Sequence, residues 1–263
     1  MKKKAIYNPL QCREVFHLEF LRGLGRKAKA ENYALKGGAN LRFFFQSLRY
    51  SEDMDLDASG IRVDVLRDTV MGIIEARTFQ ETLRSFGIEK IIPPNISKAK
   101  QTETTQRFKI HLLNLSGEDL FTKIEFSRRG LKEKTIVQPV SDVILRVYKM
   151  PPLLVPHYPA DAAILQKIKA LAMRSTIRAR DIFDIFILTS QCKEAGFFQK
   201  IGDASILKKA HDSIFKINFE QFRDTVVSYL VPEDQHAYAT PDSWDEVKLK
   251  VSHFIEEIQK KYA

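Results

Sequence analysis

The sequence predicts an α/β protein, with a sheet-bearing front half and an all-helical back half. Short runs in which apolar and polar residues alternate, as in half-buried strands, occur before residue 128. Helical periodicity fills most of the chain beyond residue 160, and a proline-rich stretch at 150–159 lies between the two patterns. We therefore expect two domains, 1–149 and 150–263.

The front half begins with a predicted helix over residues 10–30. Asn8 and Pro9 mark its start, because asparagine caps a helix N-terminus and proline fits the first turn. A short strand at 33–35 then runs into Gly37 and Gly38, and a helix over 40–48 follows. Residues 53–57 alternate three aspartates with two apolar residues, which is the period of a half-buried strand.

Further along, one long helix is expected over 62–86 and a β-hairpin over 105–127. The inward face of that helix is formed by Val63, Leu66, Val70, Ile73 and Ile74, and Gly87 ends it. The hairpin has strands at 105–115 and 120–127. In the back half, helices are expected over 162–174, 179–192, 204–217, 219–230 and 244–262.

Composition narrows the classes of protein that fit the chain. Its 263 residues carry a formal net charge of +9, which favours polyanionic partners such as nucleic acid. The two cysteines, Cys12 and Cys192, give no support to a thiolate zinc site or a disulfide framework. Apolar runs are short and interrupted by charge, and no apolar segment follows Lys2-Lys3-Lys4, so we expect a cytoplasmic protein without membrane association.

The most informative pattern joins a glycine pair to closely following aspartates. Gly37 and Gly38 allow the backbone to approach phosphate oxygens, and Asp53 and Asp55 offer the hard oxygen ligands that Mg²⁺ prefers. On a strand the two aspartates share a face, about 6.5–7 Å apart along the backbone. Glu125, on the polar face of the second hairpin strand, is the candidate third carboxylate for two-metal phosphoryl chemistry.

Two other interpretations of the aspartates fit less well. A calcium-binding loop would need glycine where Ala58 stands and a bidentate glutamate where Asp64 stands. A solvated acidic turn does not explain the apolar Met54 and Leu56 between the acids.

A second polar group lies beyond the proline-rich stretch. Lys167 and Arg174 lie on related faces of a predicted helix, and Asp181 and Asp184 share one side of the next. Lys167 could contact a triphosphate or neutralise leaving pyrophosphate, with Asp181 orienting Lys167 or Arg174. A purely structural network of ion pairs is an equally good interpretation of the same residues.

Taken together, these segments resemble the AbiEii/AbiGii toxin family, which are nucleotidyltransferase-like proteins of type IV toxin–antitoxin systems. The resemblance covers residues 33–190 in order and rests on four segments: Gly37–Arg42, Arg49–Asp55, Ile124–Ser127, and Lys167–Arg174 with Arg180–Asp184. It implies a polymerase-β-like nucleotidyltransferase fold, a mixed sheet with helices followed by a helical domain.

The resemblance also implies roles for individual residues. Asp53 and Asp55 would be catalytic and, with Glu125, would hold Mg²⁺ or alternatively Mn²⁺. Lys167 and Asp181 would complete the catalytic set. Nucleotide binding would fall to a larger group: Lys36, Gly37, Gly38, Arg42, Ser51 and Arg174.

The resulting expectation is an enzyme that transfers a nucleotide from an NTP to an acceptor and releases pyrophosphate. RNA, in particular the 3′ end of tRNA, is the expected acceptor, and an antitoxin encoded nearby is the expected protein partner. The alternative is a nucleotide- or RNA-binding protein of the same fold without catalytic activity.

Overall fold

The computed structural model describes residues 7–192 and 203–262, which form two compact units. The first, here called the sheet unit, comprises Met1–Phe44 and Tyr50–Tyr158. The second, here called the helical unit, comprises Phe45–Arg49 and Pro159–Ala263. The lysines at positions 2–4 lie outside the described residues.

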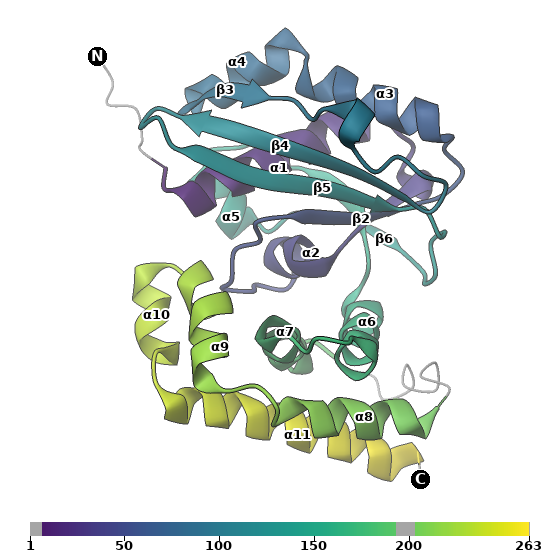
Figure 1. The fold of residues 1–263 in the computed structure, drawn as a ribbon, viewed down its shortest axis with the longest axis vertical. Coiled ribbons are helices and arrows are strands. Elements are labelled where there is room, and N and C mark those ends of the chain that lie inside the picture. Colours follow the sequence, from purple (N-terminus) through teal and green to yellow (C-terminus); the bar gives the residue numbers. More distant parts are fainter. Residues whose placement is uncertain (1–6, 193–202, 263) are drawn as a thin grey trace. The chain divides into compact units, whose positions relative to one another are not determined.

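A mixed seven-stranded sheet in the order β3-β4-β5-β2-β1-β7-β6 forms the sheet unit (Figure 1). The pairs β1–β7 and β2–β5 are parallel, and the other neighbours are antiparallel. The predicted α/β class is therefore confirmed. The strands are β1 (Tyr33–Lys36), β2 (Met54–Ala58), β3 (Ile88–Ile92), β4 (Thr105–Asn114), β5 (Asp119–Ser127), β6 (Ile136–Pro139) and β7 (Leu154–His157).

Helices cover one face of this sheet and enclose the core. The helices are α1 (Pro9–Lys27), α2 (Gly37–Phe44), α3 (Val63–Ile74), α4 (Arg77–Ser85) and α5 (Asp142–Val147), with short 3-10 turns at Ala30–Asn32 and Ile96–Lys98. In Figure 1, α1 lies behind β4 and β5, and α3 and α4 lie alongside it. Apolar side chains from these helices and from the sheet pack into one cluster, which includes Phe16, Leu66, Val70, Phe108 and Phe126.

The predicted start of the first helix is confirmed. Asn8 Oδ1 accepts a hydrogen bond from the Gln11 backbone N–H at 2.9 Å, and the Asn8 N–H donates to Gln11 Oε1 at 3.0 Å. Pro9 occupies the first turn, where its missing N–H costs nothing.

The single helix predicted over 62–86 is wrong, because the chain forms α3 and α4 instead. Between them Ala76 is extended, with ψ 126°, and the chain changes direction. Leu66 and Val70 of α3 and Phe79 and Leu83 of α4 are all buried. No glycine or proline marks the break. The helix is therefore divided because the apolar faces of α3 and α4 pack separately against the rest of the unit.

The helix predicted over 40–48 is also displaced. Helix α2 begins at Gly37 itself and ends at Phe44, and Gln46 has a φ of 56°, which is incompatible with a continuing helix. Strands β3, β6 and β7 and helix α5 were not predicted. Strand β7 lies within the proline-rich stretch; its Pro156 stands opposite Val137 of β6, and the neighbouring His157 pairs with Leu35 of β1.

The helical unit contains α6 (Ala160–Met173), α7 (Ala179–Thr189), α8 (Ala204–Ile214), α9 (Phe219–Thr225), α10 (Pro232–Tyr238) and α11 (Pro241–Tyr262), with a 3-10 turn at Val227–Tyr229. Helix α10 was not predicted, whereas the others begin within a few residues of expectation. Trp244 stacks on Phe222 with ring centroids 4.2 Å apart, and its indole N–H donates to the Ile217 carbonyl. Across the ranges 7–192 and 203–262, no helix has the length and apolar character needed to cross a membrane.

Candidate active site

The glycine pair and the aspartate strand meet at the start of α2. Gly37 has a φ of +70°, and a Cβ added to it would lie 3.0 Å from Asp55 Oδ2. A side chain at this position would therefore meet both a strained backbone and the carboxylate. Gly37 is required for a close approach, as well as for the turn between β1 and α2.

Register across three strands places the predicted residues in one row. Lys36 on β1 pairs with Asp55 on β2, and Asp55 pairs with Glu125 on β5. The next position in the row, on β4, is Arg107. The parallel pairing of β2 with β5 is what brings Glu125 beside Asp55, and the sequence alone did not reveal it.

Basic side chains already neutralise part of this acidic row. Lys123 Nζ lies 3.0 Å from Asp53 Oδ2 and 4.0 Å from Glu125 Oε2. Arg107 Nε donates to Glu125 Oε2 at 2.6 Å. The sequence analysis did not single out Lys123 or Arg107, although Lys123 stands two residues before Glu125 on the same face of β5.

Asp55 is partly buried, and its protonation equilibrium reflects that. Desolvation raises the pKa of the Asp55 carboxyl above its ordinary value, and the neighbouring charges of Glu125 and Asp53 raise it further. Lys123 and Lys36 act in the opposite direction without cancelling the shift. The ionised carboxylate of Asp55 is thus held at a net cost in the folded protein.

Lys36 is held by Asp57, the second aspartate of β2. Its Nζ lies 2.5 Å from Asp57 Oδ1, and the other oxygen of Asp57 accepts a hydrogen bond from the Tyr158 hydroxyl at 2.7 Å. Asp57 is 6% exposed. The sequence analysis gave Asp57 no role, but its position two residues after Asp55 on the same strand face was a usable signal.

Two other predicted nucleotide-binding residues make contacts that hold the local structure. Ser51 Oγ donates to the Asp53 carbonyl at 2.7 Å and so fixes the loop before β2. Arg42 Nε donates to Glu14 Oε1 at 2.7 Å, and its guanidinium lies 4.1 Å from the centroid of the Tyr50 ring. Gly38 stands next to Gly37 in the first turn of α2.

The acidic side chains of this site are chemically suited to bind a hard divalent cation. Carboxylates of Asp53, Asp55 and Glu125 are the oxygen ligands that Mg²⁺ and Mn²⁺ take. Within the described part of the chain, no three acidic, histidine or cysteine side chains are grouped closely enough to hold a metal ion as they stand. The Lys123 ammonium group lies between Asp53 and Glu125. A metal ion bound by these acids would therefore replace Lys123 as the positive charge that neutralises them.

The second predicted group lies in the helical unit and forms a buried charge cluster. Asp184, 0% exposed, accepts from Arg49 Nη2 at 3.1 Å and lies 2.5 Å from Lys167 Nζ. Lys167 also reaches Asp181 Oδ1 at 3.2 Å, and Asp181 accepts a hydrogen bond from Arg174. The expected pairing of Asp181 with Lys167 and Arg174 is present, with Arg49 as a further member.

The surroundings of Asp184 stabilise its ionised form. Burial opposes ionisation, but the charges of Arg49 and Lys167 and their hydrogen bonds outweigh it, and the pKa of Asp184 falls below its ordinary value. Arg49 belongs to the segment Phe45–Arg49, which packs with the helical unit although it lies between α2 and β2 in sequence. Arg49 stands two residues before Ser51, and the sequence gave no separate role for it.

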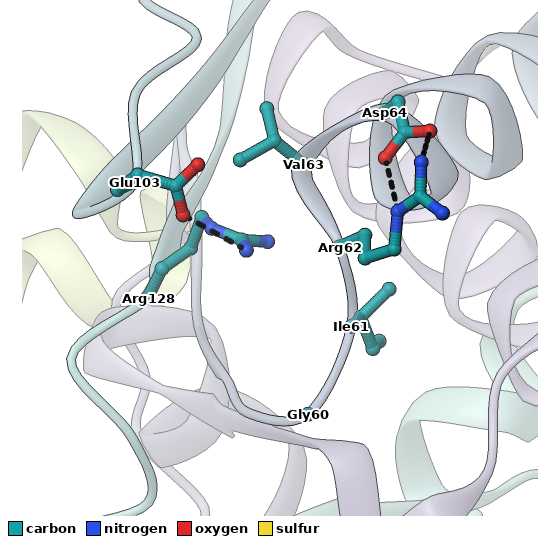
Figure 2. A pocket seen from close by; sticks show the side chains of 7 residues that line it. All are labelled: Gly60, Ile61, Arg62, Val63, Asp64, Glu103 and Arg128. Atoms are coloured by element: carbon teal, nitrogen blue, oxygen red, sulfur yellow. Dashed lines mark hydrogen bonds and ion pairs between the residues drawn. The ribbon is translucent and has the colours of Figure 1, made fainter.

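A surface pocket of about 380 Å³ lies elsewhere on the sheet unit (Figure 2). Residues 60–64, Glu103 and Arg128 line it. Figure 2 shows Arg62 turned toward Asp64 on one side and Arg128 toward Glu103 on the other. None of the predicted site residues lines this pocket, and its own arginines already have acidic neighbours.

Solved structures with this fold include nucleotidyltransferases. The nucleotidyltransferase toxin MenT4 from Mycobacterium tuberculosis aligns with a TM-score of 0.60 and 13% identity, covering 96% of this chain and 92% of that one. JHP933 from Helicobacter pylori aligns with a TM-score of 0.55 and 18% identity, covering 98% and 94%. At these identities the likeness establishes the fold. No curated protein matches the chain in sequence.

Family membership follows from the sequence itself. Residues 19–245 match the profile of the family described as nucleotidyl transferase AbiEii toxin, type IV toxin–antitoxin system. The chain belongs to this family, and the resemblance inferred from its motifs is confirmed. It is a nucleotidyltransferase of the toxin class.

Proposed function

We propose that the protein is a Mg²⁺-dependent nucleotidyltransferase that adds a nucleotide from an NTP to the 3′ end of an RNA, with tRNA as the leading acceptor. It would act in the cytoplasm as the toxin of a toxin–antitoxin pair, held in check by an antitoxin protein. The observation that carries the proposal is the approach of Gly37 to Asp55, which joins a phosphate-binding turn to a metal-binding acid.

The sheet unit supplies the groups needed at the triphosphate. The backbone N–H groups of Gly37 and Gly38, at the start of α2, can donate hydrogen bonds to phosphate oxygens. The helix dipole also favours negative charge at this end of the helix. Lys36, oriented by Asp57, adds a cation beside Asp55. We leave Arg42 out of the nucleotide site, because its guanidinium is committed to Glu14.

Asp53 and Asp55, with Glu125 as the third acid, would hold the metal. When bound, Mg²⁺ would stabilise charge on the α-phosphoryl oxygens and favour deprotonation of the acceptor hydroxyl. In the reaction the acceptor oxygen bonds to the α-phosphorus, the bond between the α-phosphorus and the β-phosphate oxygen breaks, and pyrophosphate leaves with that electron pair. The hydroxyl proton passes to solvent or to a nearby base.

We assign Lys167 and Asp181 to the catalytic set because they stand at positions that match the family's motifs. In the helical unit Lys167 is held between Asp181 and Asp184, which fixes the direction of its ammonium group. Arg174, 38% exposed, is the member of this cluster most open to solvent.

The alternative, a nucleotide- or RNA-binding protein without activity, has one observation in its favour. Both Asp53 and Glu125 are already neutralised by Lys123 and Arg107, so the acids are satisfied without a metal. Under this alternative the protein would bind NTP without transferring it.

The test is a transfer assay with each α-labelled NTP, Mg²⁺ and total bacterial tRNA. The wild type is compared with an Asp53→Ala/Asp55→Ala double variant and with Asp68→Ala, an exposed acid on α3 outside the site. Label in RNA with the wild type and with Asp68→Ala, but not with the double variant, supports the proposal. Equal labelling by the double variant refutes the mechanism, and NTP binding without labelling by any protein favours the alternative.

A further inference from the structure

The solvent-facing side of β4 and β5 carries an exposed aromatic pair. Phe121, 40% exposed, lies opposite His111 in the strand register, and their ring centroids are 5.4 Å apart in an edge-on arrangement. Core residues such as Phe108 and Ile124 point to the other face of the same strands, toward α1. An apolar ring left on the open face of a sheet contributes nothing to the core of this unit.

Basic side chains share this face with the aromatic pair. Lys109 stands directly opposite Lys123 in the register, and like charges at opposed positions destabilise a sheet. Lys123 is compensated by Asp53, but Lys109 is exposed and has no ion-pair partner anywhere in the described ranges. Asp119 offsets part of the positive charge, since its carboxylate lies 2.9 Å from His111 Nδ1.

The same face leads directly to the proposed active site. We call the five residues Arg107, Lys109, His111, Phe121 and Lys123 the β4–β5 platform. Phe121 stands four residues before Glu125 on β5, a distance of about 13 Å at the usual strand rise. That length matches about four stacked nucleotides at roughly 3.4 Å each.

We propose that the β4–β5 platform binds the single-stranded 3′ segment of the acceptor RNA. Bases would stack on the Phe121 and His111 rings, while Lys109 and Lys123 would face the phosphates. Exposed aromatic rings interleaved with cations are how proteins bind single strands, because every base has a face to stack, whereas paired bases in a duplex keep theirs covered. The inference rests on the proposed function for its choice of RNA as the occupant.

The test measures binding without transfer. A 5′-dye-labelled ten-nucleotide RNA, either single-stranded or annealed to its complement, is titrated by fluorescence anisotropy in EDTA, without NTP, at several salt concentrations. The variants are Phe121→Ala, Phe121→Leu, Phe121→Tyr and Lys109→Gln. Matched controls are Leu115→Ala, another exposed apolar residue (49%) in the hairpin turn, and Lys134→Gln, an exposed lysine outside the platform.

Loss of the ring should weaken binding about 5- to 100-fold, in Phe121→Ala and Phe121→Leu alike, and Phe121→Tyr should restore it. Lys109→Gln should lower the slope of log affinity against log salt by about 0.7. Leu115→Ala and Lys134→Gln should behave as the wild type. Phe121→Leu retains most of the apolar volume, so it remains informative if Phe121→Ala proves unstable in a thermal melt.

Three results would overturn the platform: unchanged binding by the Phe121→Leu variant, equal binding of duplex and single strand, or no binding of single-stranded RNA by the wild type. None of these decides whether nucleotide transfer occurs. Conversely, Phe121-dependent RNA binding by a protein that transfers no label would keep the platform and refute the activity.

Discussion

The backbone of Gly37 lies against the carboxylate of Asp55, so that a Cβ at position 37 would come within 3.0 Å of Asp55 Oδ2. Two motifs separated by eighteen positions in sequence are thus in direct contact in space. The contact exists because β1 and β2 pair antiparallel with Lys36 opposite Asp55. Any side chain at position 37 would press on the carboxylate that we propose as a metal ligand.

Gly37→Ala should therefore reduce transfer by about tenfold or more, because the Asp55 carboxylate must yield by a few tenths of an ångström and the rate depends steeply on the position of reacting groups. Gly117→Ala is the matched control. Gly117 also has a positive φ, +79°, but nothing lies within 4 Å of an added Cβ. Both variants should lose about 1–2 kcal/mol of stability in urea unfolding from backbone strain, and only Gly37→Ala should lose activity. Equal activity losses in the two would show that the contact with Asp55 is unimportant.

Asp55→Asn should abolish transfer and yet make the protein more stable at neutral pH. Because the pKa of Asp55 is raised in the folded state, ionising this group costs folding free energy once the pH exceeds that pKa. The amide removes this cost. The thermal midpoint of the variant should exceed that of the wild type at pH 7, and the difference should vanish as the pH is lowered through the Asp55 pKa. A variant less stable than the wild type at pH 7 would contradict this expectation.

Tyr158→Phe should raise KM for NTP about tenfold, because the lost hydroxyl leaves Asp57 freer to move and Lys36 less well oriented. Tyr148→Phe is the control, since Tyr148 is equally buried and donates to the carboxylate of Glu14 at 2.6 Å, away from Lys36. Both substitutions should cost about 1.5 kcal/mol of stability. Steady-state kinetics would contradict the assignment if KM rose equally in both.

Asp184→Ala should destabilise the protein by about 3–5 kcal/mol, because it removes the buried carboxylate that faces both Arg49 and Lys167, and Lys167 keeps only its contact with Asp181. Asp224→Ala, an exposed acid paired with its neighbour Arg223, should change stability by less than about 1 kcal/mol. The lowered pKa of Asp184 means that its contribution is present above the ordinary aspartate range and is lost as the pH falls through the lowered value. Urea unfolding at pH 7 measures the first effect, and a stability difference that does not shrink as the pH is lowered from 7 into strong acid would contradict the second.

Local chemistry in the sequence was enough to place the first helix, the hairpin and the aspartate strand. The Asn8 cap, the alternation in β4 and β5 and the alternation around Asp55 depend on neighbours a few residues away. The break between α3 and α4 was not predictable in this way, because it depends on how the apolar faces of the two helices pack against residues distant in sequence. Strand β7 was missed for a related reason: it is a strand by virtue of pairing with β1 and β6.

The sequence by itself determined the class of chemistry, because residues 19–245, which include the glycine pair and the aspartates, match the AbiEii nucleotidyl transferase family. Only the tertiary structure decided which partners each of these residues has. Asp57 holds Lys36, Lys123 and Arg107 neutralise the acids, and Arg49 joins Asp184 and Lys167. These contacts link residues between 18 and 135 positions apart, and strand register and helix packing create them. Residue type determines the chemistry of which a side chain is capable, and the tertiary structure determines the groups with which it interacts.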